Sequence, residues 1–161
     1  MTTSVTRDVG GADEAPSITV VRTIAAPVAR VFAAWTDPAL LQQWLAPGFM
    51  RVVEARVDAR PGGRYRVVVA DPAGNRHVTT GEYREVVRDR RLVQTWIYEG
   101  DDPPVTRIPT LLTVDFRDTG AGATELTIRQ DQLPTPEYRE GNRAGWASCL
   151  DKLARLVADG G

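Results

Sequence analysis

The hydrophobic positions near the end of the chain follow a helical period. Large apolar residues recur at spacings of three and four between residues 135 and 158, namely at Trp146, Cys149, Leu150, Leu153, Leu156 and Val157. Such a stripe is typical of an amphipathic helix with one buried face. Thr135 as N-cap, followed by Pro136, marks its start, and a Gly pair at residues 160–161 marks its end. The pattern predicts one long helix that needs a broad apolar surface to lie on.

Most of the preceding chain alternates with a period of two. A β-branched run at Ser17–Ile24 predicts a first strand. Further alternating segments, separated by turns rich in Gly, Pro, Asn and Asp, predict about six antiparallel strands at residues 51–58, 64–70, 76–87, 91–99, 108–117 and 124–131. With one sheet face covered, the expected inward residues are Tyr65, Val67, Val69, Tyr83, Leu112, Val114, Phe116, Leu126, Ile128 and Gln130.

Two short helices are predicted between the first strand and the others. Val28–Thr36 carries apolar residues at helical spacing. Asp37 can cap a second helix with Pro38 at its first position, and Pro47 and Gly48 close it. The element order therefore predicts an α+β fold: a curved antiparallel sheet of about six to seven strands, with two short helices and one long C-terminal helix.

The same pattern of apolar and polar positions predicts the domain organisation. Residues 1–16 are polar and Gly-containing, and are expected to form a disordered or flexible tail. Residues 17–158 form a single expected domain, because no linker of domain scale interrupts them. Residues 159–161 are expected to be a short C-terminal tail.

Composition and charge argue against several classes of protein. Lys and Arg number 20 against 21 Asp and Glu, for a net charge of -1, which disfavours a nucleic-acid partner. No apolar run approaches the roughly 18 residues of a membrane span, and the start of the chain lacks the pattern of a signal peptide. Cys149 is the single cysteine, so no internal disulfide forms and a cytoplasmic location is expected.

Several sequence blocks, in order, resemble a known family. They are Ala26-Pro27 with Val31-Phe32 and Ala34-Trp35-Thr36-Asp37-Pro38, then Leu41 and Trp44, Asp58 with Arg60-Pro61-Gly62-Gly63, Gly81 with Tyr83 and Glu85-Val86, Arg91-Leu92-Val93 with Thr95-Trp96, Leu126-Thr127-Ile128, and Gly145-Trp146 with Leu150 and Leu153. Over roughly residues 17–157 the chain resembles the SRPBCC (START-like, Bet v 1-like) superfamily. Within it, the chain is most similar to the branch related to the activator of Hsp90 ATPase homologue 1.

The resemblance implies a helix-grip fold with a hydrophobic cavity between the sheet and the C-terminal helix. Members of the superfamily bind lipids, polyketides and other apolar small molecules, a few are cyclases or aromatases, and many have no assigned activity. Relatives often carry a His or another polar residue at the position that resembles Gln130. Glutamine keeps hydrogen-bonding capacity there but removes an acid/base group.

Candidate cavity residues are inward strand residues, large aromatic side chains, residues of the helical stripe, and one arginine that precedes an inward strand. They are Trp44, Tyr65, Tyr83, Trp96, Arg107, Leu112, Val114, Phe116, Gln130, Trp146, Cys149 and Leu150. Trp44 and Trp96 are expected at the cavity mouth, and Arg107 can reach a ligand carboxylate. His77 is expected to be a strand surface residue. One His and one Cys without spaced partners argue against a metal site, and no cofactor is expected.

Three functions remain open at this point. The leading hypothesis is binding of an apolar or aromatic small molecule without chemistry, because no catalytic constellation occurs in the sequence. The second is an aromatase- or cyclase-like enzyme that uses Tyr65, Tyr83, Gln130 or Arg107 to orient a polyketide. The third is a chaperone-associated interaction module, which requires an exposed apolar patch or a charged groove. The sequence also leaves a homodimer open.

Overall fold

A computed structural model describes residues 4–7, 17–101 and 104–159. Eleven elements follow one another along these residues, and their bounds are β1 (Ser4–Arg7), β2 (Ser17–Ile24), α1 (Val28–Thr36), α2 (Pro38–Leu41), β3 (Arg51–Val57), β4 (Arg64–Ala70), β5 (Arg76–Val87), β6 (Arg91–Asp101), β7 (Pro104–Asp118), β8 (Thr124–Asp131) and α3 (Pro136–Asp159). The predicted α+β class, with two short helices and one long C-terminal helix, is confirmed.

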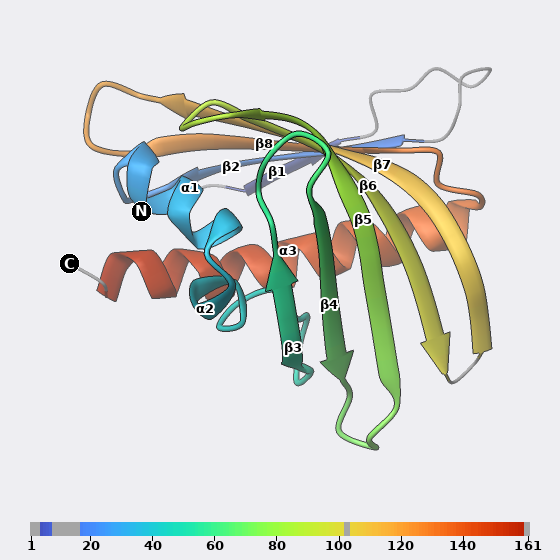
Figure 1. Cartoon of the computed structure of the whole chain (residues 1–161). Coiled ribbons are helices and arrows are strands. Elements are labelled where there is room, and N and C mark those ends of the chain that lie inside the picture. The colour runs from blue at the N-terminus through green and yellow to red at the C-terminus, as the bar shows by residue number, and fades with distance from the viewer. Residues whose placement is uncertain (1–3, 8–16, 102–103, 160–161) are drawn as a thin grey trace.

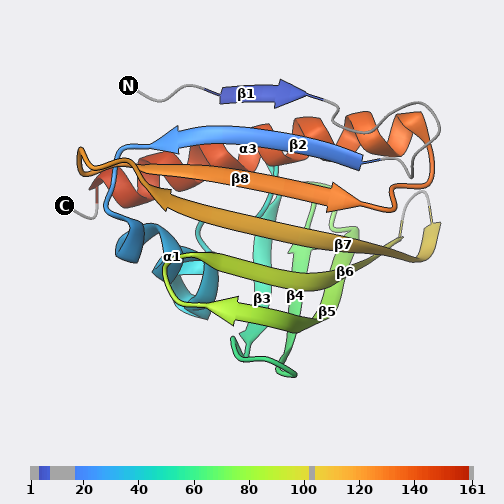
Figure 2. The same cartoon turned by 90° about the horizontal axis from the view of Figure 1, so that it is seen from above.

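The sheet is antiparallel, with the strand order β1-β2-β8-β7-β6-β5-β4-β3. It curves around α3, which crosses its concave side, while α1 and α2 lie at one end (Figure 1). Seen from above, β1 lies beside β2 at one edge of the sheet (Figure 2). The covered concave face explains the alternating sequence, since every second residue of these strands points toward the helices.

The strand predictions needed three changes. A strand at Ser4–Arg7, within the expected tail, was not predicted, and it brings the sheet to eight strands. The remainder of that tail lies outside the described residues. The strands predicted at residues 91–99 and 108–117 are both longer than expected, because β6 continues to Asp101 and β7 already begins at Pro104. Both strands extend because their ends pair with each other, as the partners Asp101 and Pro104 show.

Both predicted caps are present. The Asp37 side chain accepts a hydrogen bond from the backbone N–H of Ala39 at 2.9 Å, and Pro38 opens α2. The Thr135 hydroxyl accepts one from the N–H of Tyr138 at 3.0 Å, which fixes the start of α3. The second helix is shorter than predicted and ends at Leu41. The chain then continues in turns that still bury Trp44 and Leu45.

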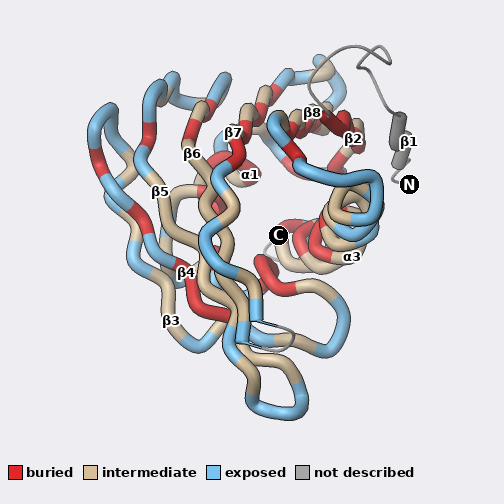
Figure 3. Tube along the Cα trace, turned by 90° about the vertical axis from the view of Figure 1, so that its right-hand side faces the viewer, coloured by how far each residue is buried: buried red, intermediate tan, exposed pale blue. Residues whose placement is uncertain are grey.

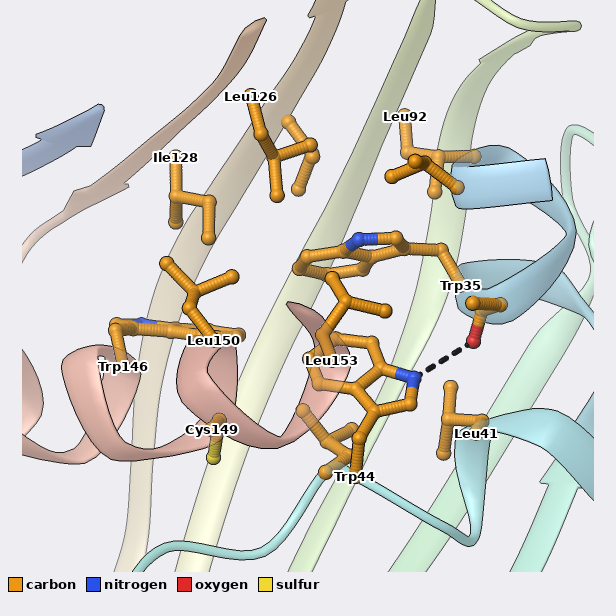
Figure 4. Packing of buried hydrophobic residues seen from close by; sticks show 14 of the residues in the cluster. Trp35, Leu41, Trp44, Leu92, Leu126, Ile128, Trp146, Cys149, Leu150 and Leu153 are labelled. Atoms are coloured by element: carbon orange, nitrogen blue, oxygen red, sulfur yellow. Dashed lines mark hydrogen bonds between the residues drawn. The ribbon is translucent and has the colours of Figure 1, made fainter. Parts of the chain in front are cut away.

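The core lies between the concave face and the three helices. Buried residues follow the inner side of the sheet and one face of α3 (Figure 3). All ten predicted inward residues are buried, and so are five of the six stripe residues of α3, while Leu156 is half-buried. Leu153 reaches from α3 to the space between Trp35 and Trp44, and Leu150 points toward Ile128 of the sheet (Figure 4). The C-terminal half of α3 is therefore packed like an ordinary core helix.

Candidate functional site

A cavity of about 340 Å³ lies under the N-terminal half of α3 and is partly open to solvent. The sheet contributes residues of β4, β5 and β6, α3 forms the opposite wall, and the loop between α2 and β3 closes one side. Its lining residues are Leu45, Pro47, Met50, Val67, Val69, His77, Thr79, Trp96, Tyr98, Tyr138, Gly141, Asn142, Gly145, Trp146 and Cys149. This volume is at the small end of the range for ligand pockets.

The hollow has a cause in the sequence of α3. Its cavity-facing residues are spaced three and four apart at Tyr138, Gly141, Asn142, Gly145, Trp146 and Cys149, so they form one helix face. Gly141 and Gly145 have no side chain to fill the space beneath them. A Cβ added at Gly141 meets no atom within 4 Å, and one at Gly145 meets only Pro47 Cβ, at 4.0 Å. The two glycines therefore leave the sheet uncovered at this place.

Aromatic side chains form one wall of the cavity. The rings of Trp96 and Trp146 lie 5.3 Å apart, and Trp146 stacks on Trp35 at 5.7 Å. Trp146 is fixed by polar contacts behind the wall, because its Nε1–H donates to Gln130 Oε1 at 2.9 Å. Gln130 Nε2 donates in turn to the Thr110 hydroxyl, which donates to the Trp96 carbonyl. Gln130 thus positions the wall while lying outside the lining.

Polar groups gather at another part of the lining. His77 Nδ1 lies 2.7 Å from the Tyr98 hydroxyl, and His77 Nε2 lies 3.3 Å from Asp71 Oδ2. The rings of Tyr98 and Tyr138 lie in an edge-to-face arrangement with centroids 6.4 Å apart, and Asn142 donates to the Tyr138 carbonyl. Burial raises the pKa of Tyr138 to about 12, so its phenol remains neutral at physiological pH. The cavity therefore combines an apolar aromatic wall with a small group of hydrogen-bonding side chains.

Three of the twelve predicted cavity residues line it: Trp96, Trp146 and Cys149. Burial raises the pKa of the Cys149 thiol to about 12, so it is protonated and a poor nucleophile. The other nine lie elsewhere. Leu112, Val114, Phe116 and Leu150 belong to the packed core, as do Tyr65, Tyr83, Gln130 and Trp44, while Arg107 is exposed and pairs with Glu99 at 3.3 Å.

The placement of Trp44 differs from the expected cavity mouth for a packing reason. It is 1% exposed, and its Nε1–H donates to the Ala34 carbonyl at 2.9 Å (Figure 4). Its ring meets the ring of Trp35 edge-on, at 4.8 Å. Since both its polar and its apolar groups are satisfied by α1, Trp44 joins the core instead of the cavity.

The polar residues of the site were not predicted from the sequence. The interpretation of His77 as a strand surface residue was wrong, because its side chain is only 17% exposed and lines the cavity. Tyr138, Asn142 and the two glycines were not singled out either. Their spacing along α3 was a usable signal, since it continues the apolar stripe of Trp146 and Cys149 toward the N-terminus.

Two absences apply to the described part of the chain alone. Within it, no helix is long and apolar enough to cross a membrane. Nor do three or more His, Cys, Asp or Glu side chains gather there in a way that could hold a metal ion.

Comparison with known proteins identifies the relatives of this site. The family model for Activator of Hsp90 ATPase homolog 1-like protein matches residues 25–158. A protein of Chromobacterium violaceum, solved by crystallography, is 32% identical, with a TM-score of 0.75 over 88% of this chain and 96% of that one. A crystal structure from Nitrosomonas europaea is 27% identical, with a TM-score of 0.75 over 89% and 94%. No curated protein matches the chain.

A third crystal structure shows how far the fold extends beyond close sequence similarity. The AHSA1 protein of Silicibacter pomeroyi is 22% identical to this chain, with a TM-score of 0.75 over 100% of both chains. At this level of identity the match speaks for the fold alone.

Proposed function

The chain belongs to the Activator of Hsp90 ATPase homolog 1-like family, a branch of the SRPBCC superfamily, and from that premise we propose that it binds an apolar or aromatic small molecule in the cavity beneath α3. The observation that carries this proposal is the pair Gly141 and Gly145. Glycine inside a helix costs about 1 kcal/mol relative to Ala. Two of them facing one hollow destabilise the helix but keep the space open, which suits a site that a ligand occupies.

The character of the lining supports the same function. Most of the walls are apolar, with Trp96 and Trp146 as large flat surfaces suited to an aromatic ligand. The few polar side chains gather around Tyr98 instead of being scattered. Such a lining, mostly hydrophobic with a small number of placed polar groups, is typical of small-molecule sites.

A binding experiment tests the proposal. Native mass spectrometry and tryptophan fluorescence are measured against a panel of lipids and aromatic metabolites, with wild type and Gly145→Leu. We expect wild type to bind members of the panel, and Gly145→Leu to lose that binding while keeping its circular dichroism spectrum, because the added side chain fills the cavity.

Ala144→Leu is the matched control, since it places the same side chain at the preceding residue of α3, which is exposed. It is expected to bind as wild type does. Failure of wild type to bind any member of the panel would refute the proposal. Equal binding by Gly145→Leu would place the ligand elsewhere on the molecule.

The enzyme hypothesis has lost its geometric support. It required Tyr65, Tyr83, Gln130 or Arg107 to orient a substrate, and none of these four lines the cavity. Tyr65 donates its hydroxyl proton to the Thr95 carbonyl, and Gln130 uses its amide for Trp146 and Thr110. The hydrogen-bonding groups of Tyr65 and Gln130 are therefore already used within the protein.

The family name does not lead us to propose a chaperone-associated role. In the part of the chain whose side chains are described, the exposed large hydrophobic residues are Phe49, Val53 and Val87. The charges of the whole chain balance to -1, which offers no field for steering a protein partner. No observation on this surface favours that hypothesis over ligand binding.

A further inference from the structure

A hydrogen-bonded polar triad at the cavity consists of Asp71, His77 and Tyr98. The direction of its hydrogen bonds is set by Asp71. Asp71 lies in the turn between β4 and β5, where its Oδ1 accepts hydrogen bonds from the backbone N–H groups of Ala73 at 3.0 Å and Asn75 at 2.9 Å. The other oxygen, Oδ2, remains for His77 at 3.3 Å. The turn thus holds the carboxylate in place.

The Asp71 carboxyl is ionised, which sets the role of His77. Burial acts to raise the pKa of Asp71, but the hydrogen bonds from His77, Asn75 and Ala73 outweigh it and lower the pKa below its usual value. An ionised carboxylate only accepts hydrogen bonds. When the imidazole is neutral, the proton that it donates to Asp71 must sit on Nε2, which leaves Nδ1 without one.

A bare Nδ1 decides the direction of the second hydrogen bond. It can only accept, so the Tyr98 O–H donates to it across the 2.7 Å contact. Burial, and then the negative charges of Asp101 and Asp71, raise the pKa of Tyr98, so the phenol keeps its proton. With that proton directed at His77, the Tyr98 oxygen has only acceptor capacity left for the cavity.

The sheet register makes room for this contact. His77 pairs with Gly100, and Thr79 pairs with Tyr98, so His77 and Tyr98 project from the same face of the sheet. A Cβ on Gly100 would lie 2.5 Å from the Tyr98 hydroxyl oxygen and 3.1 Å from Cζ. The absence of a side chain at Gly100 is therefore what lets the Tyr98 phenol lie back over its own strand and reach His77.

We propose that the polar triad makes the Tyr98 oxygen a dedicated hydrogen-bond acceptor at the cavity, and that the ligand is an apolar or aromatic molecule carrying a hydroxyl group that donates to it. This inference rests on the proposed function and specifies the ligand class. Donation to His77 also polarises the phenol, which strengthens its oxygen as an acceptor. The aromatic wall of Trp96 and Trp146 takes the apolar body of the ligand.

The tautomer is tested first, without any ligand. His77 is the only histidine in the chain, so the imidazole signals in a ¹⁵N spectrum are assigned without ambiguity. At a pH where the ring is neutral, we expect a protonated Nε2 and a bare Nδ1. A proton on Nδ1 overturns the inference, because that nitrogen would then donate to Tyr98 and reverse the triad.

The ligand class is tested with matched probes. Binding of 2-naphthol is compared with that of 2-methoxynaphthalene, which has the same ring system but no hydrogen-bond donor. One neutral hydrogen bond corresponds to about a three- to ten-fold preference for 2-naphthol. We expect this preference in wild type, and its loss in Tyr98→Phe, while 2-methoxynaphthalene binds both proteins alike.

Three further variants separate the triad from the rest of the lining. Tyr138→Phe removes a phenol from the same cavity and is expected to keep the preference. Gly100→Ala displaces the Tyr98 hydroxyl without deleting a polar group, and is expected to lose it. In Asp71→Asn the Oδ1 is still needed by two backbone N–H groups, so the new amide donates to Nε2. The neutral His77 ring must then carry its proton on Nδ1, so the ¹⁵N spectrum should show the opposite tautomer.

The outcomes distinguish this inference from the proposed function. If wild type binds both probes equally, the inference fails while the proposed function stands. If the preference disappears in Tyr138→Phe and survives in Tyr98→Phe, the donor contacts Tyr138 and the inference fails as well. If wild type binds neither these probes nor any member of the ligand panel, both proposals fail together.

Discussion

At the residue scale, the most informative polar side chain is Gln130. The sequence predicted an inward polar residue whose burial needs partners, and the structure supplies them through Trp146 and Thr110. Gln130 is completely buried, so a partner that lost its hydrogen bond to Gln130 would find no water to replace it. The residue that resembled a ligand contact is thus a positioning residue for the aromatic wall.

Substituting Gln130 by Leu tests that role. We expect a loss of about 1–3 kcal/mol in the free energy of unfolding, because the buried Nε1–H of Trp146 is left without an acceptor. Urea unfolding measures the loss. The double variant Gln130→Leu with Trp146→Phe removes both partners. Its loss of stability should therefore be smaller than the sum of the losses in the two single variants. Strict additivity would contradict a direct interaction between these side chains.

At the element scale, α3 is divided into two halves by its sequence. Tyr138, Gly141, Asn142 and Gly145 face the cavity, whereas Leu150, Leu153 and Val157 pack into the core. Side chains of the second half also hold neighbouring elements, because Asp151 pairs with Arg22 of β2 at 2.6 Å. One half therefore anchors the helix while the other covers the site.

This division predicts that stability can be gained at the cavity. We expect Gly141→Ala and Gly145→Ala each to raise the free energy of unfolding by about 0.5–1 kcal/mol, because Ala favours the helix and no atom lies closer than 4.0 Å to the new Cβ. Urea unfolding of each variant gives the change. As a control, Gly120→Ala should destabilise, since Gly120 has a φ of +86°. A loss of stability in both helical variants would show that neighbouring atoms lie closer than 4.0 Å to the new Cβ atoms.

At the scale of the whole molecule, the tyrosines and the cysteine share one electrostatic property. All four tyrosines, Tyr65, Tyr83, Tyr98 and Tyr138, have a raised pKa, chiefly because burial disfavours the phenolate. Burial raises the pKa of Cys149 in the same way, to about 12. The folded protein therefore holds protons that the unfolded chain releases at lower pH.

Stability is consequently expected to fall at alkaline pH. In the unfolded chain the thiol titrates near 9 and the phenols near 10, whereas in the folded protein Cys149 and Tyr138 titrate at about 12. Between these values the unfolded state binds fewer protons, so the free energy of unfolding decreases as the pH rises. The stability contributed by these groups is complete below about pH 9 and is lost toward pH 12.

Urea unfolding at several alkaline pH values, together with the tyrosinate absorbance, measures this effect. We expect tyrosinate to appear in the folded protein only above pH 10, the value for unshifted tyrosine. Its appearance should accompany unfolding. Denatured protein is the control, and should titrate near the unshifted value. Phenols that ionise in the folded protein as they do in denatured protein would contradict the burial of these side chains.

Apart from β1, the sequence by itself determined the elements and their order. Period two along the strands, the stripe of Trp146 to Val157, and the caps at Asp37 and Thr135 are local signals, because each depends on residues within a few positions of one another. They also identified the inward residues, since alternation tells which face of a strand is covered. The family resemblance placed a cavity between sheet and helix, and a cavity lies there.

Only the tertiary structure decided which residues form that cavity. Alternation assigned Tyr65, Val67 and Leu112 to one face, but only Val67 lines the cavity. Alternation does not say where along the sheet α3 is packed and where its glycines leave a hollow. His77 and Tyr98 meet because β5 and β6 pair in one register, and because Gly100 leaves space between them. Contacts between residues far apart in the chain depend on strand register and helix placement, which no local pattern encodes.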